Sequence, residues 1–180
     1  RITTYPEKGR LGRGEVKQVL GDPGTLETQT LAVIRSKELP HRFGRKVSGE
    51  ASSLPKVPSK EDIIGRKDLR SFSFVTIDGV KAKDFDDALF ARATGDGAIE
   101  LYVSIADVSH YIQAGSAIDE EARNRGNSVY FPESVIAMLP ERLSNVLCSL
   151  RPGEDKLSFT CQVRIDPDGN PKQHSLYESV

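Results

Sequence analysis

The stretch Thr76-Ile77-Asp78-Gly79-Val80-Lys81-Ala82-Lys83-Asp84-Phe85-Asp86-Asp87 decides how the rest of the sequence is interpreted. It places four aspartates within ten residues, between two apolar segments. On an extended chain Asp84 and Asp86 point the same way and Asp87 points the other way. Gly79 lets the backbone bend after Asp78. We therefore expect a loop that brings Asp78 back beside Asp84, Asp86 and Asp87.

The segments around this loop have the pattern of antiparallel strands. Residues 71–77 precede it, and residues 88–92 and 99–105 follow it. Thr94-Gly95-Asp96-Gly97 separates the last two and predicts a hairpin. Residues 157–165 alternate apolar and polar side chains, which predicts a half-buried strand that ends at a turn over residues 166–170.

Helices are predicted between these strands and before them. Ser116 can cap a helix that runs to Arg125 and stops at Gly126. A second apolar set recurs at helical spacing, namely Leu143, Val146, Leu147 and Leu150. A short helix is expected over residues 41–52, with a linker at residues 53–58. The pattern predicts an α+β fold with a mixed, mostly antiparallel sheet.

The first third of the chain has short apolar runs broken by glycine. Residues 14–20 and 30–35 are expected to be strands, separated by a turn at Gly21-Asp22-Pro23-Gly24. Such strands suggest the end of a small OB-type β-barrel. We therefore divide the chain into barrel strands at residues 1–39, a helix and linker at 40–65, and a mixed α and β domain at 66–180.

Composition and charge narrow the class of protein. The chain of 180 residues is 37% hydrophobic and 28% charged, so it can form a core, and it has no apolar run long enough for a membrane helix. The net charge of −1 hides a balance of +6 in residues 1–60 and −7 in residues 61–180. This asymmetry suits a protein that attracts a polyanion in one place and holds cations in another. Two cysteines in apolar surroundings suggest a reduced, cytoplasmic protein.

The aspartate group has three interpretations. Several close carboxylates repel one another, and a divalent cation removes the repulsion. Oxygen ligands without Cys or His favour Mg²⁺, with Mn²⁺ as a substitute, over Zn²⁺. One alternative is an exposed acidic turn. The other is a calcium loop, although the spacing lacks the EF-hand alternation and its closing glutamate.

Several ordered motifs resemble the catalytic domain of the RNase II/RNase R family. They begin with residues 66–70 and 75–79 and continue through the Ala82–Ala88 segment. The similarity then extends through residues 105–111, 125–132, 138–144 and 147–150. Residues 1–65 resemble the end of the family's second cold-shock barrel and the connection after it.

The resemblance implies a 3′-to-5′ exoribonuclease that hydrolyses single-stranded RNA processively to nucleoside 5′-monophosphates. It implies that Asp78, Asp84, Asp86 and Asp87 hold Mg²⁺ and that Asp86 is the carboxylate needed for hydrolysis. It also implies that Tyr130 stacks on the terminal base, and stacking tolerates any sequence. The expected partners are the 3′ end of RNA and other RNA-decay proteins, with no membrane.

The sequence begins at Arg1 and ends on what resembles an unfinished strand, so we expect a fragment of a longer chain. The family's catalytic domain is much longer, and its remaining half supplies further site residues. The fragment alone is therefore expected to be inactive. The alternative function is a relative that binds RNA or regulates without cutting. The retention of all four aspartates favours the enzyme.

Overall fold

The computed structural model describes all 180 residues, and they form two compact units. One unit contains Arg1–Arg42 with Phe131–Ser134, and the other contains Phe43–Tyr130 with Val135–Val180. The division after Arg42 differs from the linker expected at residues 53–58. The domain limits 1–39, 40–65 and 66–180 stay predictions. None of the helices has the length and apolar character needed to cross a bilayer.

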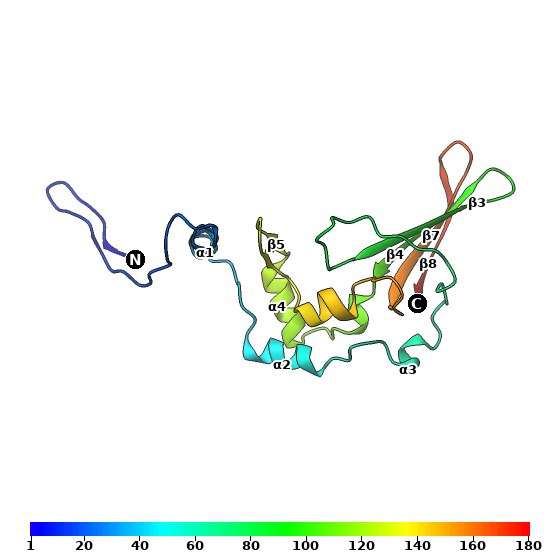
Figure 1. The fold of residues 1–180 in the computed structure, drawn as a ribbon, viewed down its shortest axis with the longest axis horizontal. Coiled ribbons are helices and arrows are strands. Elements are labelled where there is room, and N and C mark those ends of the chain that lie inside the picture. Colours follow the sequence, from blue (N-terminus) through cyan, green and yellow to red (C-terminus); the bar gives the residue numbers. More distant parts are fainter. The chain divides into compact units, whose positions relative to one another are not determined.

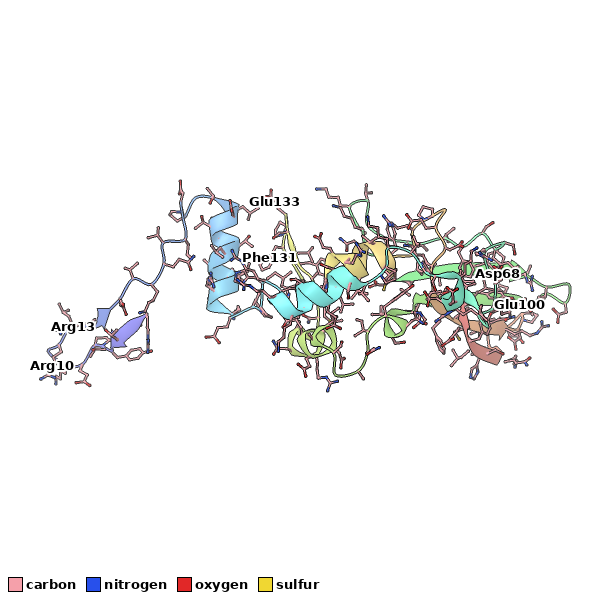
Figure 2. The ribbon with its side chains drawn as sticks, turned by 90° about the horizontal axis from the view of Figure 1, so that it is seen from below. Arg10, Arg13, Asp68, Glu100, Phe131 and Glu133 are labelled. Atoms are coloured by element: carbon pink, nitrogen blue, oxygen red, sulfur yellow. The ribbon has the colours of Figure 1, made fainter.

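The first unit has a small antiparallel hairpin and one helix. Strands β1 (Ile2–Thr4) and β2 (Arg13–Gly14) pair with Ile2 opposite Gly14. The basic residues Arg10 and Arg13 lie on this hairpin (Figure 2). Only Gly14 of the strand expected at residues 14–20 belongs to a strand, and Glu15 after it bonds to Arg1, so the prediction is wrong for residues 16–20.

The strand predicted at residues 30–35 is instead part of helix α1 (Leu26–Ser36). The expected turn at residues 21–24 is present, and it leads directly into the helix N-cap, because the Thr25 N–H donates to the Asp22 carbonyl. The Thr25 hydroxyl then accepts the N–H of Thr28. Glu27 in the first turn and Arg35 in the last complement the helix dipole. These end signals outweigh the strand preference of the β-branched residues in the middle.

The second unit is built on a four-stranded antiparallel sheet. Its strands are β3 (Asp87–Ala93), β4 (Ile99–Ala106), β7 (Ser158–Ile165) and β8 (Pro171–Ser179), in the order β3-β4-β7-β8. The two predicted turns, at residues 94–97 and 166–170, are confirmed as the hairpin connections of β3–β4 and β7–β8 (Figure 1). The expectation of mostly antiparallel pairing is therefore confirmed.

The helices of this unit pack together beside the sheet (Figure 1). They are α2 (Arg45–Ser53), α4 (Ala117–Arg125) and the π-helix η2 (Arg142–Leu147). Two shorter helices complete the unit: α3 (Lys60–Ile63) follows α2 in the sequence, and η1 (Val108–His110) precedes α4. The predicted helix from Ser116 to Gly126 is confirmed, since the Ser116 hydroxyl accepts the Asp119 N–H and Gly126 has φ 75°. Their shared core contains Val47, Ala51, Ala106, Ile118, Leu143, Leu147 and Cys148.

The strand predicted at residues 71–77 does not form. Val75 makes one isolated bridge with Leu89 in β3, and the rest of the segment is unpaired. The alternating aromatic residues pack on the sheet instead of extending its ladder. The Phe72 ring lies 4.9 Å from that of Phe90 and 5.3 Å from that of Tyr102. The alternation thus marks an aromatic cluster, because such pairs stabilise by contact without requiring strand hydrogen bonds.

A row of buried hydroxyl groups crosses β4, β7 and β8. The Thr160 Oγ1 atom lies 2.6 Å from Ser104 Oγ and 2.6 Å from Ser179 Oγ. Ser158 Oγ lies 2.8 Å from Ser179 Oγ. Because every hydroxyl in the row has a partner, its burial carries little penalty.

A buried ion pair joins Arg66, which follows α3, to Asp107, which directly follows β4. The Arg66 side chain is 3% exposed and that of Asp107 is 8% exposed, with 2.7 Å between guanidinium nitrogen and carboxylate oxygen. Arg66 also donates to the Ser158 carbonyl. Burial favours the neutral acid, but hydrogen bonds from Arg66 and Ser109 and the Arg66 charge hold the pKa of Asp107 below its usual range.

We predict that Asp107→Asn lowers the free energy of unfolding by about 3–5 kcal/mol, because it leaves the Arg66 charge buried without its counter-charge. Urea denaturation measures the loss. The control is Arg123→Gln, which breaks an ion pair with Asp119 whose arginine is 79% exposed, and it should cost less than about 0.5 kcal/mol. Equal losses in the two variants would contradict this account.

Candidate catalytic carboxylate site

The four predicted aspartates lie on one loop and the start of one strand of the second unit. Asp78 is exposed, and the turn after it is closed by the Ala82 N–H, which donates to the Gly79 carbonyl at 2.9 Å. Asp84 and Asp86 precede β3, and Asp87 is its first residue. The loop therefore bends after Asp78, at the glycine where the sequence predicted it.

The backbone of the last two aspartates is fixed by the sheet. Asp87 pairs with Ile105 in β4, and the Asp86 carbonyl accepts the N–H of Ala106 at 2.9 Å. Ala106 is part of the helical core, and Asp107 after it carries the buried ion pair with Arg66. The backbone of Asp86 is thus tied to a buried part of this unit.

The carboxylates act on one another electrostatically. Partial desolvation of the Asp86 carboxyl, followed by the negative charges of Asp84, Asp87 and Asp78, raises its pKa above the usual range. Because charge repulsion falls with distance, the three other aspartates must lie near enough to oppose the ionisation of Asp86. A cation placed among them would reverse this effect.

Tyr130 lies beside this group, although 46 residues separate it from Asp84. It ends the short strand β5 (Val129–Tyr130), which pairs with β6 (Val135–Ile136). Its hydroxyl donates to Asp84 Oδ2 at 3.3 Å, while the residue is 66% exposed. Desolvation and the Asp84 charge raise the pKa of the phenol. The side chain therefore presents a neutral aromatic ring to solvent at the edge of the carboxylate group.

Three other polar residues of this unit, His110, Arg70 and Arg125, make contacts within the fold. His110 Nε2 lies 2.9 Å from Asp62 Oδ1, and its Nδ1 lies 3.2 Å from an Arg66 nitrogen that can only donate, so Nδ1 accepts and Nε2 carries the proton. Arg70 binds Asp155 and Asp68, the latter labelled in Figure 2. The Arg125 guanidinium pairs with Glu121 and lies over the Phe43 ring, 3.9 Å from its centre.

Two family models match the chain. The model of the RNB domain matches residues 66–180, which include all four aspartates and Tyr130. This chain belongs to the RNB domain family. The model of the cold shock domain matches residues 1–44. The resemblance to the RNase II/RNase R family and the mixed, antiparallel fold with cold-shock strands are both confirmed.

Relatives of this RNB chain include ribonuclease R of Aquifex aeolicus, which is 45% identical over all of the chain. That match covers 26% of the relative, so the chain spans about a quarter of its length. Among solved structures, Mycoplasma genitalium RNase R in complex with double-stranded RNA has a TM-score of 0.89 and 34% identity, over 99% of this chain and 32% of that one. Yeast Ssd1, described as a pseudonuclease, has a TM-score of 0.74 over 99% of this chain and 23% of that one. Its identity is 23%, so the likeness shows the fold alone.

The donor chemistry of the RNB aspartates fits a magnesium ion, since all the ligands are hard carboxylate oxygens. Their positions do not yet form a coordination site, because no group of three or more His, Cys, Asp or Glu side chains lies close enough to hold an ion. The assignment of Asp78, Asp84, Asp86 and Asp87 as metal ligands therefore stays a prediction, as does that of Tyr130 as an RNA contact.

We predict that Asp86→Asn raises the melting temperature of the metal-free protein at neutral pH. The pKa of Asp86 is higher in the folded state, so folding loses stability as pH rises from the ordinary value of 3.8 through the raised value. Removing the charge abolishes this loss. The gain over wild type should disappear below pH 3.8, where both side chains are neutral.

Asp166→Asn is the matched control for this pH experiment, with the opposite sign. Hydrogen bonds from the Asn170 backbone and from Lys172 hold the pKa of Asp166 below its usual range. Its stabilising effect is present at neutral pH and lost in acid, so the variant should melt lower at pH 7. Thermal melting in a chelator, followed by circular dichroism, measures both. An Asp86→Asn variant that melts below wild type at pH 7 would contradict the assigned repulsion.

Proposed function

We propose that a protein containing this chain is a 3′-to-5′ exoribonuclease of the RNase R type. The observation that carries the proposal is the exposed side chain of Tyr130, whose hydroxyl donates to Asp84, beside carboxylates that raise the pKa of Asp86. A base-stacking surface beside a cation-attracting group is what the removal of a terminal nucleotide requires. The M. genitalium relative, solved in complex with RNA, supports RNA as the ligand.

Asp78, Asp84, Asp86 and Asp87 are the residues proposed to hold Mg²⁺, for which Mn²⁺ can substitute. When bound, the ion would polarise the phosphodiester and stabilise the leaving oxygen. The carboxylates of this chain would attract the cation and hold it against the RNA backbone. Without the cation, the negative charges of the carboxylates would repel the phosphate. Asp86, whose ionisation the other three aspartates oppose, is proposed to orient the attacking water and receive its hydrogen bond.

Tyr130 is proposed to stack on the last base and to set the distance between the strand end and the carboxylates. Every base offers a π face, so this contact suits processive degradation of single-stranded RNA of any sequence to nucleoside 5′-monophosphates. The basic balance of residues 1–60 would attract the RNA backbone. A cytoplasmic location and contacts with other RNA-decay proteins belong to the same proposal.

The proposed activity belongs to a protein of the relatives' length. Because the chain spans about a quarter of the A. aeolicus relative, we expect the 180 residues alone to cut RNA poorly. A nuclease assay on both lengths tests this expectation directly.

We predict that Asp86→Asn in the full-length protein lowers the rate of RNA hydrolysis at least about 100-fold, because it removes a charge from the reacting centre without changing shape. RNA affinity should stay nearly unchanged. The control is Asp168→Asn, the same chemical change in the exposed β7–β8 turn, which should cut at the wild-type rate. Single-turnover cleavage and filter binding measure the two quantities. Full activity in Asp86→Asn would refute its role.

We predict that Tyr130→Ala weakens the binding of short RNA by roughly 1–3 kcal/mol, the usual contribution of one stacked base. The length of the final product should also change. Tyr130→Phe keeps the ring and loses the hydroxyl, which bonds to Asp84, so it should retain most of the affinity. Product sizing on gels and affinity for a short oligonucleotide test both variants. If Phe behaves like Ala, the hydroxyl rather than the ring is the functional group.

A further inference from the structure

Ser149 is a fully buried residue two positions after the end of η2, and its hydroxyl bonds to the loop that carries the aspartates. Ser149 Oγ donates to the Lys83 carbonyl at 2.9 Å and accepts the Phe85 N–H at 3.0 Å. The N–H of Leu150 donates to the Phe85 carbonyl at 2.9 Å. Three hydrogen bonds from two adjacent residues therefore hold the backbone on both sides of Asp84.

The support behind Ser149 is rigid. Leu143 and Leu147 of η2 are 0% exposed and belong to the helical core, and Cys148 beside Ser149 is 3% exposed. Side chains packed in this way have little freedom to move. The loop segment is thus held by the core at Ser149 and Leu150, and by β4 through the bond from Ala106 to the Asp86 carbonyl.

We propose that Ser149 is a positioning residue for the carboxylate site, which sets the direction of Asp84 and Asp86 by fixing the backbone between Lys83 and Phe85. The inference rests on the proposed function, because it assigns Ser149 to the metal-binding role of that loop. Like charges on adjacent residues separate when their backbone can move. A hydroxyl that ties the loop to the core limits this movement of the backbone on both sides of Asp84.

A serine suits this position for a chemical reason. One hydroxyl can donate to a carbonyl and accept an amide N–H at the same time. Alanine can do neither, and it would leave the Lys83 carbonyl and the Phe85 N–H without these partners. Removing a residue that hydrogen-bonds to a metal-binding residue and orients it typically lowers metal affinity by about 10–100-fold.

The test compares Ser149→Ala with a buried hydroxyl that does not contact the loop. Thr160 is 0% exposed and bonds to Ser104 and Ser179, so Thr160→Val removes a buried hydroxyl at nearly constant shape. Both variants are made in the full-length protein. Their melting temperatures show how far each loss of a hydrogen bond disturbs the fold in general.

The decisive measurement is the affinity for Mn²⁺ without RNA, obtained by calorimetric titration. Ser149→Ala should bind Mn²⁺ about 10-fold or more weakly than wild type, and it should need correspondingly more Mg²⁺ for half-maximal cutting. Thr160→Val should keep wild-type values for both, even if it melts at a lower temperature. A loss of affinity in both variants in proportion to melting temperature would overturn the proposal, because it would indicate general destabilisation.

Ser149→Cys keeps the test valid if the alanine variant does not fold. A thiol is accepted in buried positions but is a weak donor and acceptor, so Mn²⁺ affinity should still fall. Wild-type affinity in a folded Ser149→Ala or Ser149→Cys would refute the positioning role. That outcome leaves the proposed function standing, whereas a wild-type protein that neither binds Mn²⁺ nor cuts RNA would refute the proposed function itself.

Discussion

Repulsion among carboxylates crowded onto one short segment is the constraint around which the second unit is organised. Asp84, Asp86 and Asp87 fall within four residues, and their charges oppose the ionisation of Asp86. A free loop would relax by spreading them apart. The fold opposes this relaxation from two directions, through strand β4 on one side and through Ser149 and Leu150, which follow η2, on the other. The free energy that opposes this relaxation comes from packing elsewhere, in the helical core, rather than from the acidic loop itself.

Most of the sheet could be predicted from the sequence because its signals are local. The two hairpins follow from glycine-containing turns between alternating runs, and α4 follows from a capping serine and a terminal glycine. The failures have equally local causes. Residues 30–35 have strand-like composition, but a cap at Thr25 starts a helix before them. Residues 71–77 alternate because Phe72 and Phe74 pack on the sheet, which periodicity cannot distinguish from strand pairing.

The candidate site likewise has some features with local sequence signals and others without them. The four aspartates within ten residues are evident in the sequence, and the bend at Gly79 follows from the conformational freedom of glycine. The contact between Tyr130 and Asp84 has no local signal, and only the family resemblance pointed to that tyrosine. Ser149 was missed altogether, because a buried serine after an apolar run looks like any small core residue. Its partners lie more than 60 residues earlier, so only the folded chain brings them together.

The row of hydroxyls through Ser104, Thr160, Ser179 and Ser158 has a consequence for how the sheet assembles. Apolar side chains tolerate small shifts of one strand along another, because one non-directional hydrophobic contact replaces another at little cost in free energy. Directional bonds do not, and a strand displaced by one residue would turn its hydroxyl to the opposite face and leave its neighbours unsatisfied in a dry interior. The row therefore favours a single register of the three strands over registers displaced by one residue, so the sheet that supports the acidic loop has one well-defined alignment.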